Sequence, residues 1–143
     1  MTTATYETDF YLWTQQQADL LRQGALSALD IDHLLEEIEG MGSSQKNSLQ
    51  SYLFNVLMHL LKWRYQPQRR GTCWELSIDN GRSAIERLIE NNPSLAPQLS
   101  TFITVEHSRA RKRAAKETGL PLTTFPDECP FSIEQITGDW WPE

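Results

Sequence analysis

Apolar side chains recur every three or four residues through most of this chain, which is the period of an α-helix with one buried face. Glycines and prolines separate these segments, and no segment alternates apolar and polar residues as a half-exposed β-strand would. The pattern predicts helices over residues 10–23, 30–39, 44–66, 72–92 and 94–118. The sequence therefore predicts an all-α protein.

Capping residues and helix breakers set the predicted boundaries. Asp9 can accept hydrogen bonds from the first free amides of the first helix, and Gly24 suits the left-handed residue that follows a helix. Gly40 and Gly42 are expected to stop the second helix, and Pro67 to end the third, because the residue before a proline is disfavoured in the helical region.

The third predicted helix is the most apolar and is expected to lie at the centre of the core. Its main apolar stripe consists of Leu49, Leu53, Val56, Leu57, Leu60 and Trp63. The fourth helix contains Gly81 near its middle, which weakens it by roughly 1 kcal/mol relative to alanine.

The end of the chain is predicted to be extended. Ser94 opens and Gly119 ends the fifth helix, and four prolines follow within residues 120–143. Ser132 and Gln135 have the spacing of a capping box, which predicts a final short helix.

We expect one domain over residues 1–143, a bundle of about five helices, because a chain of this length can bury a single core. Residues 1–8 are expected to be flexible. Residues 120–143 are expected to form an extended, proline-rich tail that packs on the bundle through its aromatic side chains.

Charge is distributed unevenly along the chain, whose formal net charge is −6. Residues 1–61 hold two cations and eight acids, residues 62–116 eleven cations and five acids, and residues 117–143 six acids and no cation. The basic block could form an anion-binding surface. We favour the alternative that the basic and acidic blocks face each other within the fold.

A cytoplasmic location is expected. The N-terminus lacks the cationic start and apolar run of a secretory signal, and the longest apolar run, residues 53–61, is too short for a membrane span. Cys73 and Cys129 are far apart in the sequence and are expected to be reduced thiols.

The stretch from residue 59 to 75, HLLKWRYQPQRRGTCWE, contains four cations and three large aromatics in a chain of negative net charge. It is our leading candidate for a contact surface, although cations at a helix C-terminus also stabilise the helix itself. The candidate binding residues there and on the preceding helices are Glu36, Glu37, Asn55, His59, Lys62, Trp63, Arg64, Arg69, Arg70 and Trp74.

Asn55, His59 and Lys62 also belong to a polar row on the apolar third helix. In a functional interpretation His59 is a general base, with the amide and the ammonium positioning an anion. The alternative, which we favour, is that the row is the solvent-exposed strip of the helix.

Residues 30–39 bring His33 and Glu37 one helical turn apart among several other acids. The Glu-x-x-His spacing of a di-iron bundle and the HEXXH motif are both absent, so no metal or other cofactor is expected. We interpret this cluster as a solvated acidic face.

A second basic cluster lies on one face of the fifth predicted helix, at Arg109, Lys112, Arg113 and Lys116. These side chains could contact phosphates, but cations near the C-terminal end of a helix also stabilise the helix. Glu106 falls on the apolar face of the same helix, where burial would require a cation such as Arg82.

Ordered peptides along the chain resemble the bacterial domain-of-unknown-function family 29, which is frequent in cyanobacteria. These peptides are DFYLW, LLEEIEGMG, HLLKWRYQP, WELSI, NPSL, ETGL and FP followed by CPF. The resemblance extends from about Tyr6 to Trp141 and implies a small, soluble, all-helical bacterial protein. It implies no reaction, cofactor or catalytic residue.

The leading functional hypothesis is a helical binding module that contacts a protein or an anionic ligand through residues 59–75. One alternative is a hydrolytic or phosphate-directed enzyme using His59, and another is a nucleic-acid accessory protein using residues 109–116. We also predict that Glu36 or Glu37 approaches His59, Lys62 or Arg64 across a groove between the second and third helices.

Overall fold

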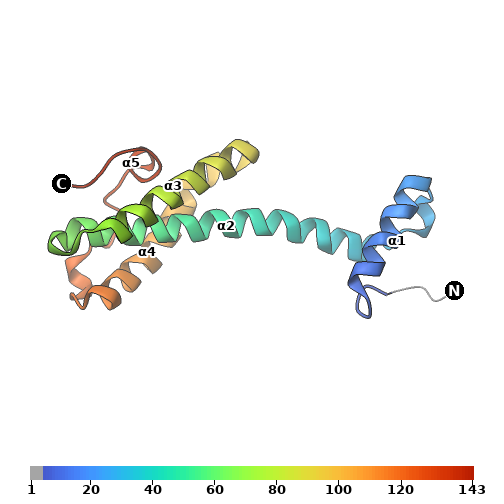
Figure 1. Cartoon of the computed structure of the whole chain (residues 1–143), viewed down its shortest axis with the longest axis horizontal. Helices are drawn as coiled ribbons and strands as arrows, with labels where there is room; N and C mark the ends of the chain where they lie inside the picture. The colour runs from blue at the N-terminus through green and yellow to red at the C-terminus, as the bar shows by residue number, and fades with distance from the viewer. Residues whose placement is uncertain (1–4) are drawn as a thin grey trace. The chain divides into compact units, whose positions relative to one another are not determined.

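The computed structural model describes residues 5–143, and the regular structure of these residues is entirely helical. The all-α prediction is confirmed. The α-helices are α1 (Phe10–Gln23), α2 (Ile31–Tyr65), α3 (Thr72–Asn91), α4 (Leu99–Thr118) and α5 (Ile133–Thr137) (Figure 1). The short 3-10 helices between them are η1 (Leu26–Ala28), η2 (Pro67–Arg69), η3 (Pro93–Gln98) and η4 (Leu122–Thr124).

Contacts within the chain define two compact units, a first unit Met1–Ser43 and a second unit Ser44–Glu143. The flexible segment predicted for residues 1–8 lies partly outside the described residues. Its remaining part, residues 5–8, forms a turn in which the amides of Thr8 and Asp9 both donate to Thr5 O, at 3.2 and 3.1 Å.

The first unit contains α1 and the beginning of α2. The predicted caps of α1 are confirmed: Asp9 Oδ1 accepts a hydrogen bond from Leu12 N at 3.1 Å, and Gly24 adopts the left-handed conformation with φ 70°. Trp13 is the large apolar side chain that α1 buries in this unit.

The predicted break at Gly40 and Gly42 is wrong, because α2 is one helix of 35 residues. A glycine ends a helix when it adopts a positive φ, and among the described residues only Gly24 and Gly119 do so. Inside a helix each glycine costs about 1 kcal/mol, which weakens α2 without interrupting its hydrogen bonds.

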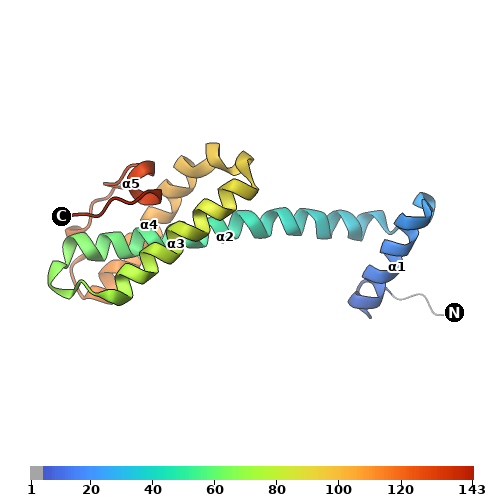
Figure 2. The ribbon, with the colours of Figure 1, turned by 45° about the horizontal axis from the view of Figure 1, so that its top comes forward.

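The second unit is built around the later part of α2, as the apolar stripe predicts. Figures 1 and 2 show α3 and α4 running beside this part of the helix. The fully buried side chains of α2 are Leu49, Leu53, Val56, Leu57, Leu60 and Leu61. They share one core with buried apolar side chains of α3, α4 and the C-terminal segment.

Glycine has a packing role at one helix contact. Gly81 of α3 lies so close to α2 that a Cβ atom added there would be 2.4 Å from Val56 Cγ2. The glycine that weakens α3 intrinsically therefore allows α3 to approach α2.

The start of α4 differs from the prediction. Residues Pro93–Gln98 form 3-10 turns, and the α-helix begins at Leu99 rather than at Ser94. Pro97 explains the difference, since it lacks an amide hydrogen and disfavours helical geometry at the residue before it. The predicted end is confirmed, with Gly119 at φ 74°.

The C-terminal segment packs on the core of the second unit. Phe125, Phe131 and Ile136 are buried, and Trp140 and Trp141 pack against the same core. The capping box is confirmed, because Ser132 and Gln135 exchange the two predicted hydrogen bonds, at 2.9 and 3.1 Å. No helix formed by residues 5–143 is both long enough and apolar enough to cross a membrane.

Candidate binding surfaces

His59 and Lys62 are buried in the second unit. His59 is 9% exposed, its Nδ1 lies 2.7 Å from Asn55 O, and burial lowers the pKa of its imidazole. Lys62 Nζ lies 3.2 Å from Glu117 Oε1 and 5.0 Å from the centre of the Trp74 ring. The polar row thus continues into the protein interior, contrary to the solvent-exposed strip that we favoured.

Glu117, the first residue of the acidic C-terminal block, pairs with two cations of the basic block. The pKa of its carboxyl group is lowered, mainly by the hydrogen bond from Arg113 and also by the one from Lys62. Burial alone would raise this pKa. Arg111 also pairs with Asp127, at 3.0 Å. These ion pairs support the prediction that oppositely charged blocks face each other.

The turn after α2 is a joint with the end of the chain. Trp63 Nε1 donates to Pro142 O at 3.2 Å, and its ring lies 4.7 Å from that of Trp141. Arg70 Nε donates to Trp63 O at 2.7 Å, and the guanidinium lies 5.1 Å from the centre of the Trp63 ring. In this stretch Arg64 and Arg69 remain exposed, and Trp74 is half-buried.

The groove was predicted between a second and a third helix, but residues Ile31–Tyr65 form one helix, α2, which contains both the two glutamates and the cations of residues 59–64. Glu36 is exposed, and Glu37 accepts a hydrogen bond from Tyr6 OH.

The basic face of α4 is partly neutralised. Arg109 pairs with Glu106 at 3.0 Å, and Arg113 pairs with Glu117 at 2.7 Å, whereas Lys112 and Lys116 are exposed. Glu106 is buried and does pair with a cation, but that cation is Arg109 and not Arg82.

Arg82 instead binds the C-terminal segment. It donates to three backbone carbonyl oxygens, of Ile136 at 2.9 Å, Gln135 at 2.7 Å and Trp140 at 2.6 Å. Burial lowers its pKa. Arg82 therefore holds the end of the chain on α3.

An aromatic cluster that we did not predict from the sequence joins α1 to the start of α2. The ring of Tyr6 stacks on His33 at 4.2 Å and meets the rings of Trp13 and Phe10 edge-on, at 4.9 and 5.5 Å. The hydrogen bond that Tyr6 donates to Glu37 raises the pKa of the phenol to about 12. The signal was present in the peptides DFYLW and DIDH, which supply most of the cluster.

Asp30 fixes this cluster in place. Its Oδ2 accepts from Trp13 Nε1 at 3.0 Å and lies 2.7 Å from His33 Nδ1, and its amide donates to Gln17 Oε1 at 2.8 Å. The hydrogen bond between the Asp30 and His33 side chains lowers the pKa of the Asp30 carboxyl group and raises the pKa of the His33 imidazole. Within residues 5–143, no group of three or more histidine, cysteine or acidic residues is placed to hold a metal ion.

The first unit leaves much of its apolar surface uncovered. Among the described residues thirteen large apolar side chains are exposed, and nine of these belong to the first unit. The nine are Phe10, Tyr11, Leu12, Leu21, Leu26, Ile31, Leu35, Ile38 and Met41.

Part of this surface forms a groove of about 330 Å³ between α1 and the start of α2. Apolar side chains from both helices line it, including Phe10, Leu21, Ile38 and Met41. Trp13 forms part of its floor and is only 3% exposed, so the aromatic cluster supports the groove from below.

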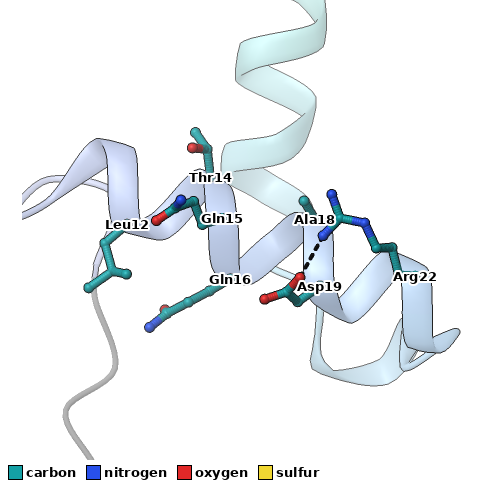
Figure 3. A pocket seen from close by; sticks show the side chains of 7 residues that line it. All are labelled: Leu12, Thr14, Gln15, Gln16, Ala18, Asp19 and Arg22. Atoms are coloured by element: carbon teal, nitrogen blue, oxygen red, sulfur yellow. Dashed lines mark hydrogen bonds and ion pairs between the residues drawn. The ribbon is translucent and has the colours of Figure 1, made fainter.

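A second hollow of about 560 Å³ is lined by residues of α1 alone (Figure 3). Thr14 and Ala18 project from the side of the helix opposite to Leu12 and Gln16, and Asp19 pairs with Arg22 at 2.5 Å. Because these side chains do not converge on one point, the hollow has no arrangement suited to binding a small molecule.

The fold and these surfaces define a class: a small all-helical protein with a basic-aromatic joint inside one unit and an open apolar groove on the other. The chain matches the family model described as domain of unknown function DUF29 over residues 5–141, and it belongs to that family. No curated protein and no solved structure matches it.

Proposed function

We propose that the protein is a helical interaction module and that the groove between α1 and the start of α2 binds one helix of a partner protein. The observation that carries this proposal is the concentration of exposed apolar side chains on the first unit. Contiguous apolar patches of this kind mark interaction sites, because covering them releases roughly 25 cal/mol per Å².

The shape of the groove favours a helix as the bound element. Two helices form its walls, and an amphipathic helix can lay apolar side chains spaced three or four residues apart between them. The contacts of Asp30 with Trp13 and His33 hold the walls together before any partner arrives. Such preorganisation reduces the entropy cost of binding.

Residues 59–75 give weaker support for a contact surface than their composition suggested. His59 and Lys62 are buried, and Trp63 and Arg70 bond to backbone carbonyls of the same unit. The enzyme alternative also receives little support, since a general base needs access to its substrate. In the nucleic-acid alternative, two of the four cations of the α4 face are already paired with carboxylates.

The test is isothermal titration calorimetry of the full-length protein with synthetic amphipathic helical peptides. The peptides share their apolar positions and differ in the charge of their polar positions. We expect at least one to bind. The double substitution Ile38→Ser with Met41→Ser should weaken it by more than about tenfold, since each buried aliphatic side chain contributes ~1.5 kcal/mol or more.

A matched control is Leu76→Ser with Val105→Ser, which removes two apolar side chains that are similarly exposed on the second unit. Circular dichroism checks that both variants keep the helical content of the wild type. The proposal is refuted if no peptide binds, or if both double variants lose affinity equally.

A further inference from the structure

The α2 wall of the groove continues into a row of apolar side chains. Ile31, Leu34, Ile38 and Met41 follow one another at steps of three or four residues, which is the spacing of the core positions in a coiled coil. Leu35 lies one helical turn after Ile31, and both are more than half exposed. Leu34, Ile38 and Met41 line the groove, whereas Ile31 and Leu35 lie outside it. We call Ile31 and Leu35 the ridge.

The exposed acids of this part of α2 lie away from the apolar face. The helical period places Asp32, Glu36 and Glu39 on the side of α2 opposite to the groove. Among residues 5–143 the only charged residue that lines the groove is Glu37, which accepts a hydrogen bond from Tyr6 OH. A second apolar surface can therefore cover this face without approaching the three exposed carboxylates.

The exposed apolar area of this face is close to what a stable dimer needs. Six large side chains of the face are between 47% and 62% exposed, and they are Phe10, Leu21, Ile31, Leu35, Ile38 and Met41. Because a large side chain has on the order of 200 Å² of surface, the six together expose roughly 600 Å² in each copy. A specific dimer buries about 800 Å² on each partner, of which rather more than half is apolar. This face alone can supply the apolar part of such an interface.

A second copy of the chain offers a surface that fits this face, namely the same face. A twofold contact places the ridge of each copy in the groove of the other, so every contact is made twice. A single foreign helix in the groove would leave the ridge exposed, whereas the twofold contact covers both features in both copies. The second unit offers no competing surface among the described residues, because its exposed large apolar side chains lie on four different elements. These side chains are Tyr52, Leu76, Val105 and Leu122.

We infer that the helix bound in the groove is α2 of a second copy of this chain, so that the protein forms a twofold-symmetric dimer. The two α1 helices and the starts of the two α2 helices then pack as a four-helix bundle, with the ridge of each copy between α1 and α2 of the other. This inference rests on the proposed function and names the partner.

The dimer is tested by sedimentation equilibrium of the full-length protein over a wide range of concentration. We expect a monomer–dimer equilibrium that the ridge variant, Ile31→Ser with Leu35→Ser, weakens by more than about a hundredfold, because each side chain is lost from both copies. The matched control, Leu76→Ser with Val105→Ser, should dimerise like the wild type. Circular dichroism checks that the variants keep their helices. A wild type that stays monomeric, or an equal effect of the two variants on dimerisation, overturns the inference.

A mixing experiment tests whether the ridge enters the groove. The groove variant, Ala18→Gln with Leu21→Ser, changes the α1 wall and leaves the ridge intact, so it should also dimerise weakly. A mixture of the groove variant and the ridge variant pairs one intact ridge with one intact groove. The mixed pair should therefore associate at least about tenfold more tightly than either variant with itself. A mixed pair that is no tighter would overturn the inference.

The salt dependence of dimerisation gives an independent signature. Residues 5–43 contain eight acids and one cation, so two first units repel each other at long range while their apolar faces attract. Raising the salt concentration screens this repulsion and should strengthen the dimer. A dimer that salt weakens steeply would be held by opposite charges, which would overturn the inference.

Failure of this inference is distinguishable from failure of the proposed function. The ridge does not line the groove, so the ridge variant provides a monomer with an intact groove, and it should bind the amphipathic peptides at least as tightly as the wild type. A monomeric wild type that binds these peptides overturns the second copy and leaves the helix-binding groove in place. A monomeric wild type that binds none of them overturns both.

Discussion

Gly81→Ala is the substitution that most directly tests the packing of α3 on α2. The new Cβ would lie 2.4 Å from Val56 Cγ2 and 3.8 Å from Tyr52 O. Val56 is fully buried, and a valine in a helix has essentially one side-chain rotamer, so it cannot turn away. The two helices must therefore separate.

Two opposing effects set the magnitude. Overpacking of a well-packed core costs about 1–3 kcal/mol, whereas alanine is better than glycine inside a helix by about 1 kcal/mol. We expect a net loss of about 1 kcal/mol in the free energy of unfolding. Gly40→Ala removes an interior glycine of α2 where an added Cβ meets nothing within 4 Å, so it should instead increase stability by up to ~1 kcal/mol.

The assay is urea unfolding followed by tryptophan fluorescence, since four of the five tryptophans, Trp63, Trp74, Trp140 and Trp141, lie in the second unit. Far-UV circular dichroism follows the helices in parallel and reports on Gly40→Ala. A change in the urea midpoint at constant slope measures stability.

A double-mutant cycle supplies the decisive control. In a Val56→Ala background the clashing methyl group is absent, so Gly81→Ala should become neutral or stabilising, with a coupling energy of about 1–2 kcal/mol. If Gly81→Ala stabilises the wild type as much as Gly40→Ala does, or costs the same with and without Val56, then the close approach of the helices does not limit packing at this position.

Three further predictions concern charged and titratable groups. Arg82→Met should lower the free energy of unfolding by about 3 kcal/mol or more in urea titrations and speed up proteolysis of the C-terminal segment, because it leaves three carbonyls without their donor. His59 and His33 should titrate on opposite sides of the ordinary histidine pKa of about 6.5 when followed by NMR. Burial lowers the pKa of His59, so the unfolded chain binds the proton more readily, and the stabilising contribution of His59 should decrease as the pH falls below about 6.5. Asp30 raises the pKa of His33, so the folded chain binds this proton more readily than the unfolded chain. The stabilising contribution of His33 should therefore be complete below about pH 6.5 and be lost as the pH rises through its folded-state pKa. Tyr6 should ionise near its raised pKa of about 12, and Tyr6→Phe should remove this step from an alkaline titration of phenolate absorbance.

Local signals predicted most of the fold. Asp9, Gly24 and Gly119 cap their helices as expected, and α2 ends just before Pro67. These features depend on residues a few positions apart, which a sequence displays directly. Gly40 could not be assigned in this way, because whether a glycine ends a helix depends on its φ angle, and the pattern of residues around it does not determine that angle.

The basic-aromatic stretch was a misleading signal for a different reason. Its composition suggested a surface, but Lys62 contacts Glu117 and Trp63 contacts Pro142, which lie 55 and 79 residues further along the chain. A helical pattern identifies a face that must be covered and does not say what covers it.

The same limit applies in the opposite direction to the start of α2. Its apolar row resembles an ordinary core-facing stripe, and only the structure reveals that Ile31, Leu35 and Ile38 are all more than half exposed. An apolar row with the spacing of a core-facing helix stripe that is nevertheless exposed is the feature expected of a helix whose packing partner belongs to another molecule.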